Sequence, residues 1–254
     1  MAQETMSASN TEAAARVNME RLRLNPYPGR GIVMGFDTAR KLGIQIYWVM
    51  GRSENSRNRV LVQDTGIVKT MPFDASRVID SSLIIYNAMI AVNGHHIVSN
   101  GDQTDTIAEA LKKKKTFEDA IRMRSYEPDK PNYTPRISGV LFTNGSSPHN
   151  EPSIILSKIV KNGDVSKKPN HHFHTYELAS LRGIGKCLHT YEGNGDPLPS
   201  FRGIPYDVLL EGSIDQLTST FWDLLNKENR VALAVKTIDL ASKAVDFRIA
   251  NQLS

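Results

Sequence analysis

The chain has 254 residues, with 31 lysines and arginines against 27 aspartates and glutamates, which gives a formal net charge of +4. Hydrophobic residues make up 40% and charged residues 23%, which is ordinary globular usage and excludes a disordered, collagen-like or coiled-coil chain. A single cysteine, Cys187, excludes a disulfide framework within the chain.

The N-terminal segment and the apolar stretches bear on where the protein acts. The first residues are polar and include Glu4 and Glu12, which is unlike a secretory signal. The longest apolar stretch, 83–92, has about half the length that a membrane helix needs. The excess of positive charge is small, and the sequence has no RRM or helix-turn-helix pattern. We therefore expect a soluble, cytoplasmic protein that binds neither a membrane nor a nucleic acid.

Residues 1–24 are expected to form an N-terminal extension, separate from a single domain over 25–254. The first ten residues predict a loose polar tail. Residues 11–24 predict a short helix, because they are helix formers and include neither glycine nor proline. Its expected end is just before Pro26, since the residue that precedes a proline disfavours helical backbone angles.

Apolar runs separated by turn residues predict antiparallel strands in the first half of the chain. The pair Asn93-Gly94 favours a tight hairpin. The expected strands lie at 31–36, at 44–50, on both sides of a turn at 64–66 within 59–73, and on both sides of Asn93-Gly94 within 81–101.

After Asp102 the hydrophobic period becomes that of a helix, so residues 102–125 are expected to be helical, with Thr104 or Asp105 as the cap. A proline-rich loop follows. The remaining expected elements are strands at 138–145 and 153–161, a turn at 162–164, an ambiguous segment at 167–178, a Gly- and Pro-rich loop at 190–205, and helices at 213–225 and 228–247.

This order of strands, helix, strands and helices has no internal repeat and no long linker. Tight hairpins favour antiparallel pairing of sequential strands. The sequence therefore predicts an α+β domain in which helices are layered on antiparallel sheets.

The densest polar cluster, Gly51–Arg59, directly follows an expected strand. Arginine forks bind phosphate oxygens bidentately, and asparagine and serine add neutral donors. We favour an anion or nucleotide site over a solvated surface loop. The polar residues of the cluster are Arg52, Ser53, Asn55, Ser56, Arg57, Asn58 and Arg59.

Other polar residues stand where either a ligand or the fold could explain them. Arg30 lies between two glycines at a strand entry, and Asn87 interrupts an apolar strand. Segment 99–106 joins a strand to a helix, where N–H groups attract anions but a capping turn is the simpler reading. Glu127 and Asp129 flank a proline, so one of them could transfer protons or pair with the nearby Arg136.

Two further features favour structural readings. The run 171–174 has three histidines, but no cysteine or second ligand pair accompanies it, so a solvated loop is preferred to a metal site. Cys187 lacks the surroundings of a catalytic thiol and is expected to be buried. The sequence has neither a GxGxxG nor a P-loop pattern, so it does not indicate ATP or dinucleotide binding.

Five motifs occur in one order and cover the chain from about Tyr27 to the C-terminal region. They are NPYPGRGIVMG, YWVMGRSENSRNR, YNAMIAVNGHHIVSNGDQTDTI, YEPDKPNYTPRI and TYEGNGDPLPSF. Together they resemble the archaeal-type IMP cyclohydrolase family.

The resemblance implies a four-layer αββα sandwich, similar to N-terminal-nucleophile hydrolases, with two antiparallel sheets between helices. It also implies closure of the purine ring of 5-formamidoimidazole-4-carboxamide ribonucleotide to give IMP and water. A ribonucleotide is then the small-molecule partner, no metal or redox cofactor is required, and a homo-oligomer is expected.

The resemblance also assigns roles, residue by residue. Arg52, Ser53, Asn58 and Arg59 would hold the phosphate or ribose, and Asn100 and Asp102 would bind the substrate, with Asn100 at the carboxamide. Arg30 would contact the nucleotide or polarise the formyl oxygen, and Tyr86 and Asn87 would donate to the base. Glu127 is the first choice for proton transfer, with Arg136 as a residue that fixes it.

The chain departs from the family pattern in two places. The loop from Arg52 to Arg59 is about two residues longer, which affects the register of Asn55 and Arg57. The first motif begins at Tyr27 without a poised Ser, Thr or Cys, so self-processing and amide hydrolysis are not expected despite the fold.

Two other functions fit the same motifs. One is a related enzyme acting on another purine or imidazole ribonucleotide, with the same phosphate contacts and different contacts to the base. The other is a non-catalytic nucleotide-binding protein, which would keep the arginine cluster and not depend on Glu127.

Overall fold

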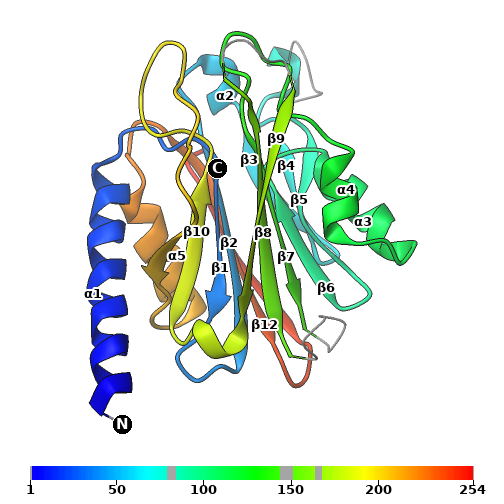
Figure 1. Ribbon diagram of the computed structural model, residues 1–254. Helices are drawn as coiled ribbons and strands as arrows, with labels where there is room; N and C mark the ends of the chain where they lie inside the picture. Colours follow the sequence, from blue (N-terminus) through cyan, green and yellow to red (C-terminus); the bar gives the residue numbers. More distant parts are fainter. Residues whose placement is uncertain (1, 79–83, 144–150, 164–167, 254) are drawn as a thin grey trace.

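The computed structural model describes residues 2–78, 84–143, 151–163 and 168–253, with side chains from residue 10 onward (Figure 1). In these ranges the strands form two antiparallel sheets. The six-stranded sheet has the order β11 (Tyr206–Leu209), β10 (Ile184–His189), β1 (Gly31–Phe36), β2 (Leu42–Met50), β12 (Arg230–Asp239), β13 (Val245–Asn251). The seven-stranded sheet has the order β3 (Val60–Asp64), β4 (Ile67–Met71), β5 (Tyr86–Val92), β6 (His95–Ser99), β7 (Arg136–Phe142), β8 (Ser153–Lys161), β9 (Pro169–Glu177).

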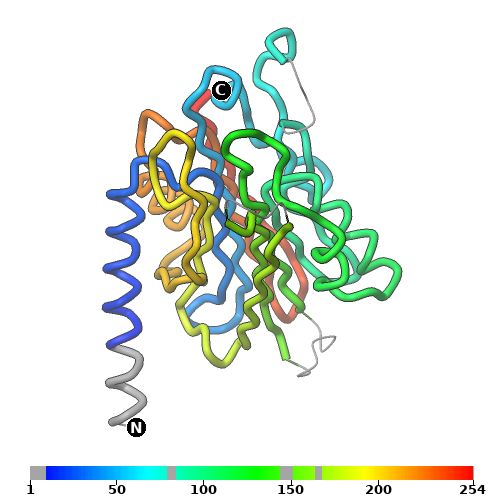
Figure 2. Tube along the Cα trace, turned by 45° about the horizontal axis from the view of Figure 1, so that its top comes forward, coloured from blue at the N-terminus to red at the C-terminus, as the bar shows by residue number. Residues whose placement is uncertain are grey.

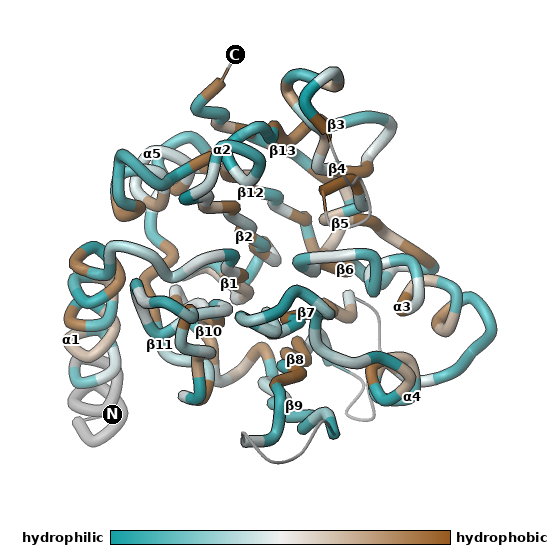
Figure 3. Tube along the Cα trace, turned by 90° about the horizontal axis from the view of Figure 1, so that it is seen from above, coloured by the Kyte–Doolittle hydropathy of each residue, from teal (hydrophilic) through white to brown (hydrophobic). Residues whose placement is uncertain are grey.

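Helices cover the outer face of each sheet, and the view from above shows the four layers (Figure 3). The helices α1 (Ala2–Leu24) and α5 (Ile214–Leu224) contact the six-stranded sheet. On the other side, α3 (Gln103–Lys112) and α4 (Phe117–Arg122) lie against the seven-stranded sheet. The predicted αββα sandwich is confirmed. Three short elements complete the described chain: α2 (Glu54–Arg57) and two 3₁₀ turns, Ala75–Arg77 and Leu178–Ser180.

The alternation of side chains along each strand builds three apolar clusters. On β1, Ile32 and Met34 belong to the cluster between the two sheets, whereas Val33 belongs to the cluster beneath α1 and α5. A third cluster joins α3 and α4 to the outer face of the seven-stranded sheet. By the same alternation Arg30, two residues before Ile32, lies at the end of the space between the sheets.

The expected final helix over 228–247 is wrong, because this segment forms β12 and the start of β13. β12 pairs with β2 on one side and β13 on the other, and its positions 231–236 are all buried. A strand buried on both faces has apolar residues at every position, so its pattern also satisfies helical spacing. The expected helix at 213–225 is present as α5.

The expected single helix over 102–125 is two helices. Lys114 has a φ of 57°, which ends the first helix, and Thr116 opens the second with a reciprocal capping box to Asp119. Thr104 and Asp105, the expected caps, lie inside α3, and Asp102 occupies the N-cap position without a side-chain cap bond.

Two polar segments differ from the expectation: residues 171–174 and the N-terminal helix. Residues 171–174, expected in a loop, lie in β9, which pairs with β8 along its whole length at the edge of the sheet. The N-terminal helix begins at Ala2 and is longer than the expected helix over 11–24, and Ala15 and Leu22 are buried in the clusters beside the sheet. Parts of expected elements at residues 81–83, 144–145 and 164 lie outside the described residues.

The close contact of Gly31 with Trp48 gives a test of the packing beside Arg30. A Cβ at Gly31 would lie 1.9 Å from Trp48 Cζ2, and this tryptophan is fully buried. We expect Gly31→Ala to lower the free energy of unfolding by about 1–3 kcal/mol in urea titrations, since the core must shift to admit a methyl group. The matched control is Gly193→Ala, whose Cβ would meet its nearest neighbour, Asn25 Oδ1, at 3.6 Å. Equal losses in the two variants would contradict this account.

Candidate active site

A cavity of about 400 Å³ opens at one end of the sandwich, where loops from both sheets gather. Figures 1 and 2 place the loop after β2, the loop after α4 and the loop after β10 at this same end. The lining residues are Tyr27, Gly29, Arg30, Met50, Arg52, Ser53, Asn55, Ser56, Arg59, Glu127, Asp129, Asn132, Thr134, Tyr191 and Leu198.

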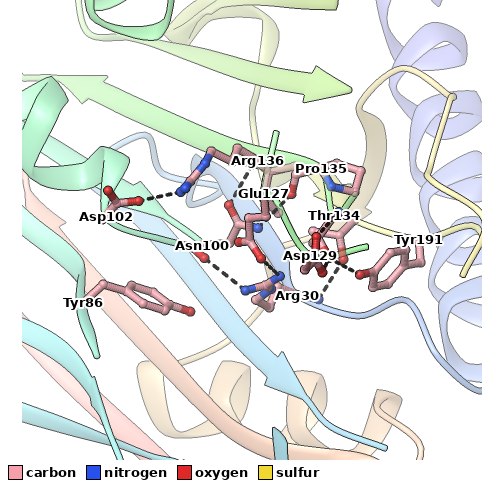
Figure 4. Close-up of polar contacts among 12 residues, drawn as sticks. Arg30, Tyr86, Asn100, Asp102, Glu127, Asp129, Thr134, Pro135, Arg136 and Tyr191 are labelled. Carbon is pink, nitrogen blue, oxygen red and sulfur yellow. Dashed lines mark hydrogen bonds and ion pairs between the residues drawn. The ribbon is translucent and has the colours of Figure 1, made fainter. Parts of the chain in front are cut away.

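A buried ion pair forms the floor of this cavity (Figure 4). Arg30 Nη2 donates to Glu127 Oε2 at 2.9 Å, and the two residues are only 9% and 2% exposed. Arg30 Nη1 also donates to the carbonyl oxygen of Asn100 at 3.4 Å. The pair joins residues 97 positions apart, one at the start of β1 and one in the loop after α4. It therefore holds the cavity ends of the two sheets together.

Backbone hydrogen bonds fix both partners of the pair. The Arg30 N–H donates to Thr190 Oγ1 at 3.1 Å, and the Thr190 N–H donates back to the Arg30 carbonyl at 2.9 Å. The Glu127 N–H donates to the Thr134 carbonyl at 2.9 Å. The backbone is thus held in place at both Arg30 and Glu127. The two side chains therefore need little reorganisation to act on a bound molecule.

Burial also decides the protonation of the pair. Removal from water raises the pKa of the Glu127 carboxyl, and the attraction of Arg30 only partly offsets this effect. Arg30 remains protonated, because Glu127 and neighbouring tyrosines hold its pKa well above the ordinary value despite burial. A buried carboxyl with a raised pKa accepts a proton more readily than an ordinary one, which suits Glu127 to accept and return a proton during a reaction.

A relay of hydroxyl groups lies beside the ion pair. The Thr134 hydroxyl contacts both the Tyr191 hydroxyl and the Asp129 carboxylate, and Asp129 Oδ1 accepts from the Thr134 N–H at 2.7 Å. Because a carboxylate accepts and a threonine has one O–H, Thr134 donates to Asp129 and accepts from Tyr191. Burial raises the pKa of Tyr191, which therefore keeps its proton.

Arginines occupy the outer part of the cavity. Arg52 lies over the Tyr27 ring at 5.1 Å and donates to Asn194 and to the Gly195 carbonyl. Arg59 lines the cavity, and its buried Nε has no hydrogen-bond partner among the described residues. Guanidinium groups with donors to spare suit a phosphate. Arg57 differs, because it bonds to the Gly51 carbonyl and Asn229 and does not line the cavity.

The cavity brings together five of the eleven residues to which the resemblance assigns roles: Arg30, Arg52, Ser53, Arg59 and Glu127. Their signals were local: the arginines and Ser53 stand next to apolar strands, and Glu127 stands beside a proline in the loop before β7. The cavity also includes Asn55, Ser56 and Asp129, which the polar pattern had singled out. Six other selected residues do not line the cavity: Asn58, Tyr86, Asn87, Asn100, Asp102 and Arg136.

Asn58 and Asn100 are buried amides that serve the backbone. Asn58 exchanges two hydrogen bonds of 2.8 Å with the backbone of Asp74. Asn100 donates to the Pro135 carbonyl and accepts from the Ile137 N–H, both at 2.9 Å. Their side chains fix the backbone around the cavity. The substrate-binding roles expected for them stay predictions.

Tyr86 and Asn87 point to opposite faces of the seven-stranded sheet, because they are successive residues of β5. The Tyr86 hydroxyl lies 2.6 Å from the Tyr47 hydroxyl between the sheets, and its ring points toward Arg30 (Figure 4). Asn87 faces α3 and donates to Asp105 at 2.8 Å. Tyr86 therefore stands beside the ion pair, whereas Asn87 lies against α3 on the other face of the sheet. The contacts to the base expected for both stay predictions.

Asp102 and Arg136 pair with each other at 2.7 Å, and Arg136 also donates to Gln103. Arg136 is close in sequence to Glu127, but Arg30 occupies the position beside that carboxylate. Arg136, on β7, thus bonds directly to residues at the start of α3, while its charge still acts on the Glu127 carboxyl and, against the larger effect of burial, lowers its pKa. The expectation that Arg136 fixes Glu127 stays a prediction.

The sequence analysis did not select five of the residues that line the cavity: Tyr27, Asn132, Thr134, Tyr191 and Leu198. Tyr27 and Tyr191 stack on each other with ring centroids 6.0 Å apart. Both lie within the quoted motifs, next to glycine- and proline-rich turns, and an aromatic residue at such a turn was the available signal. No signal in the sequence marked Thr134, because its hydrogen-bond partners are brought together only by the fold.

Cys187 is fully buried, as expected, and burial raises the pKa of its thiol to about 12. Among the described residues, no group of three or more His, Cys, Asp or Glu side chains is placed to hold a metal ion. Nor does that part of the chain contain a helix with the length and apolar character to span a membrane.

Comparison with known proteins places the cavity within a family match. A family model described as IMP cyclohydrolase-like protein matches residues 27–243. An IMP cyclohydrolase of Methanococcus aeolicus is 33% identical over 170 residues, which is 65% of this chain and 74% of that protein. An IMP cyclohydrolase of Halobacterium salinarum is 29% identical over 125 residues, which is 48% of this chain and 60% of that protein. The match covers the cavity and leaves α1 outside.

Proposed function

The chain belongs to the IMP cyclohydrolase-like protein family, and from this premise we propose that it closes the purine ring of 5-formamidoimidazole-4-carboxamide ribonucleotide. It is an enzyme with a small nucleotide as substrate, and IMP and water are the proposed products. The observation that carries this assignment is the buried Arg30–Glu127 pair inside a cavity whose outer part holds Arg52 and Arg59.

The reaction is intramolecular, so the enzyme contributes mainly by stabilising charge and transferring protons. The carboxamide nitrogen attacks the neighbouring formyl carbon, and both groups already sit on one imidazole ring. An amide nitrogen is a poor nucleophile, and the formyl oxygen takes negative charge as the new C–N bond forms. The enzyme must therefore stabilise that oxygen and move protons between nitrogen and oxygen.

Arg30 and Glu127 fit these two tasks. Arg30 donates to Glu127 and to the Asn100 carbonyl, and its guanidinium has further N–H groups for a developing oxyanion. Glu127 takes a proton from the attacking carboxamide nitrogen and delivers it to the former formyl oxygen. Water then leaves with the proton of the formamido nitrogen as the C=N bond forms, so Glu127 moves protons without a net change.

The outer cavity fits the phosphate. Arg52 and Arg59 supply positive charge, and Ser53, Asn55 and Ser56 add neutral donors on the same loop. The Tyr27 ring holds the Arg52 guanidinium from one side. In this orientation the base extends inward from the phosphate toward the ion pair.

The assignment is tested by following IMP formation in the ultraviolet with purified protein, the formamido-carboxamide ribonucleotide and a chelator. We expect turnover that the chelator does not affect. Saturable IMP binding without turnover would favour a relative with another substrate or a non-catalytic nucleotide-binding protein. Neither turnover nor binding would contradict the assignment altogether.

Arg52→Ala tests the phosphate contact. Loss of one charge-assisted hydrogen bond costs about 1.5–3 kcal/mol, so we expect KM to rise by about tenfold to a hundredfold while kcat changes much less. The matched control is Arg57→Ala, which removes an arginine of the same loop that does not line the cavity. Similar KM values for the two variants would place the phosphate elsewhere.

A cytoplasmic homo-oligomer remains our proposal for the form of the protein in the cell. In support of the oligomer, α1 leaves Val17 and Leu24 exposed at 53% and 71%. The two residues are seven positions apart and therefore share one face of the helix, which a second chain would cover in the proposed oligomer.

A further inference from the structure

A second cavity, of about 560 Å³, lies between α1 and the outer side of the six-stranded sheet. Leu22 and Asn25 line it from the helix side, and His189, Phe201 and Tyr206 line it from β10, β11 and the loop that joins them. It shares no lining residue with the catalytic cavity. Its size is typical of cavities that bind small organic molecules.

Three aromatic rings make one wall of this cavity. The His189 centroid lies 4.2 Å from that of Phe201 and 5.6 Å from that of Tyr206. Lys158 holds Phe201 in place: its Nζ donates to the Phe201 carbonyl at 3.0 Å and lies 4.9 Å from the ring centroid. The wall is thus formed before any ligand arrives, and flat rings are the shape that stacks on it.

His189 adds a polar group with a defined preference. It is only 4% exposed, and its Nδ1 lies 2.8 Å from the Tyr191 carbonyl. A carbonyl accepts, so Nδ1 carries the proton. Burial lowers the pKa of His189 to about 4, so the ring is neutral and Nε2 is an acceptor. A ligand that satisfies Nε2 must bring a donor.

The charges around the cavity argue for a ligand without net charge. Arg21 and Glu192 both line it, so one cation is matched by one anion. This differs from the catalytic cavity, where three arginines face two carboxylates. An uncharged base or nucleoside therefore fits better than a phosphorylated one.

Three consecutive residues connect this cavity to the catalytic one. His189 lines the second cavity and donates to Tyr191, whose side chain lines the first. Between them, the Thr190 carbonyl accepts from the Phe201 N–H at 2.9 Å, and the Thr190 N–H donates to the Arg30 carbonyl. A shift of the aromatic wall thus reaches both the Tyr191 hydroxyl and the backbone of Arg30.

We propose that the cavity beneath α1 binds an uncharged purine base or nucleoside through ring stacking and an N–H donated to His189, and that its occupancy changes turnover through Tyr191 and Arg30. Purines combine a flat ring system with ring N–H donors at a size that the cavity admits. The second half of the proposal, the effect on turnover, rests on the proposed function; the binding half does not.

The binding half is tested by equilibrium dialysis with hypoxanthine. Gly193→Leu places a side chain in the cavity at a position that admits a Cβ, and His189→Phe keeps a ring but removes Nε2 and the bond to Tyr191. We expect both variants to bind hypoxanthine at least tenfold more weakly than the wild type, and Arg52→Ala to bind it within twofold. Caffeine, a purine without an N–H donor, should bind the wild type at least tenfold more weakly than hypoxanthine does.

Several results would overturn the binding half. They are an absence of hypoxanthine binding to the wild type, binding that both cavity variants retain, loss of binding in Arg52→Ala, and equal binding of caffeine. A cavity filled by a second copy of the chain would give the first of these results. Because dialysis needs no turnover, this outcome is independent of the cyclohydrolase assay.

The effect on turnover is tested in the same assay as the main activity. Saturating hypoxanthine should change wild-type kcat at least twofold and leave Gly193→Leu unaffected, since that variant has no room for the ligand. Equal effects on both proteins would show that hypoxanthine acts in the catalytic cavity. Binding of hypoxanthine without any effect on kcat would overturn the proposed effect on turnover, while the proposed binding site would stand.

Discussion

Replacing Glu127 with glutamine is expected to lower kcat by about a hundredfold to ten-thousandfold, which is the usual contribution of a positioned proton-transfer group. Glutamine keeps the size of the side chain and can still bond to Arg30, but it cannot accept a proton from the carboxamide nitrogen. IMP should therefore bind the variant about as tightly as it binds the wild type. Steady-state kinetics with the formamido-carboxamide ribonucleotide and IMP titrations measure the two quantities.

The pH profile of the wild type adds a second readout. Burial raises the pKa of Glu127, and the reaction needs the carboxylate at the start. Activity should therefore be complete above this raised pKa and fall as the pH drops through it. The same limb should be missing from the residual activity of Glu127→Gln.

Asp102→Asn is the matched control for this variant. Asp102 is also a carboxylate near an arginine, but it is half exposed, lies at the N-cap position of α3 without a side-chain cap bond, and does not line the cavity. We expect its kcat to stay within about threefold of the wild type, because no proton transfer is lost. A larger loss in Asp102→Asn than in Glu127→Gln would reverse the assignment of the proton-transfer group.

Arg30→Met is expected to have the largest effect on stability. The change leaves Glu127 buried at 2% exposure without its partner, and breaking a buried pair in this way costs about 3–5 kcal/mol of the free energy of unfolding. Urea titrations at pH 7.5 measure this loss. Activity should also fall, because the oxyanion loses its main donor.

The loss must depend on pH, and its sign follows from Glu127. In Arg30→Met the folded-state pKa of Glu127 rises further, since the attraction of the arginine is gone. The folded protein then holds a proton that the unfolded chain releases above about pH 4.3. The wild-type Glu127 already has a raised pKa, so both proteins behave alike up to that pKa. Stability relative to the wild type therefore falls as the pH rises through the wild-type pKa of Glu127 and levels off above the still higher pKa in Arg30→Met.

Glu127→Gln in the Arg30→Met background is the control. It removes the charge that the first change left unpaired, so part of the lost stability should return at pH 7.5. A pH-independent loss that the second substitution does not relieve would falsify the view that Arg30 stabilises the fold through Glu127.

Local chemistry was readable from the sequence. Asn93 and Gly94 have positive φ angles and join β5 to β6 in the expected tight hairpin, because few residue pairs adopt that backbone. The arginine-rich loop and the Arg30 segment were likewise found from charge next to glycine after or before an apolar strand. These features depend on neighbours in the sequence, so spacing alone is informative.

Contacts between side chains that are distant in the sequence could not be predicted from it. Arg136 is nine positions from Glu127, whereas the residue that pairs with it is Arg30, 97 positions away. Which arginine reaches the carboxylate is decided by the stacking of two sheets, and no local pattern carries that information. The same holds for Asn58 and Asn100, since an amide that binds backbone and an amide that binds substrate look alike in sequence.

The position of α1 has a consequence for how the protein could be altered. The family match begins at residue 27, so every residue that lines the catalytic cavity lies inside it, while Leu22 and Asn25 of the second cavity lie outside. The helix α1 therefore contributes to the second cavity and to the core beside the sheet, but supplies no residue that lines the catalytic cavity. Exchanging its inner face would redesign what the enzyme responds to while every residue that carries the reaction keeps its identity.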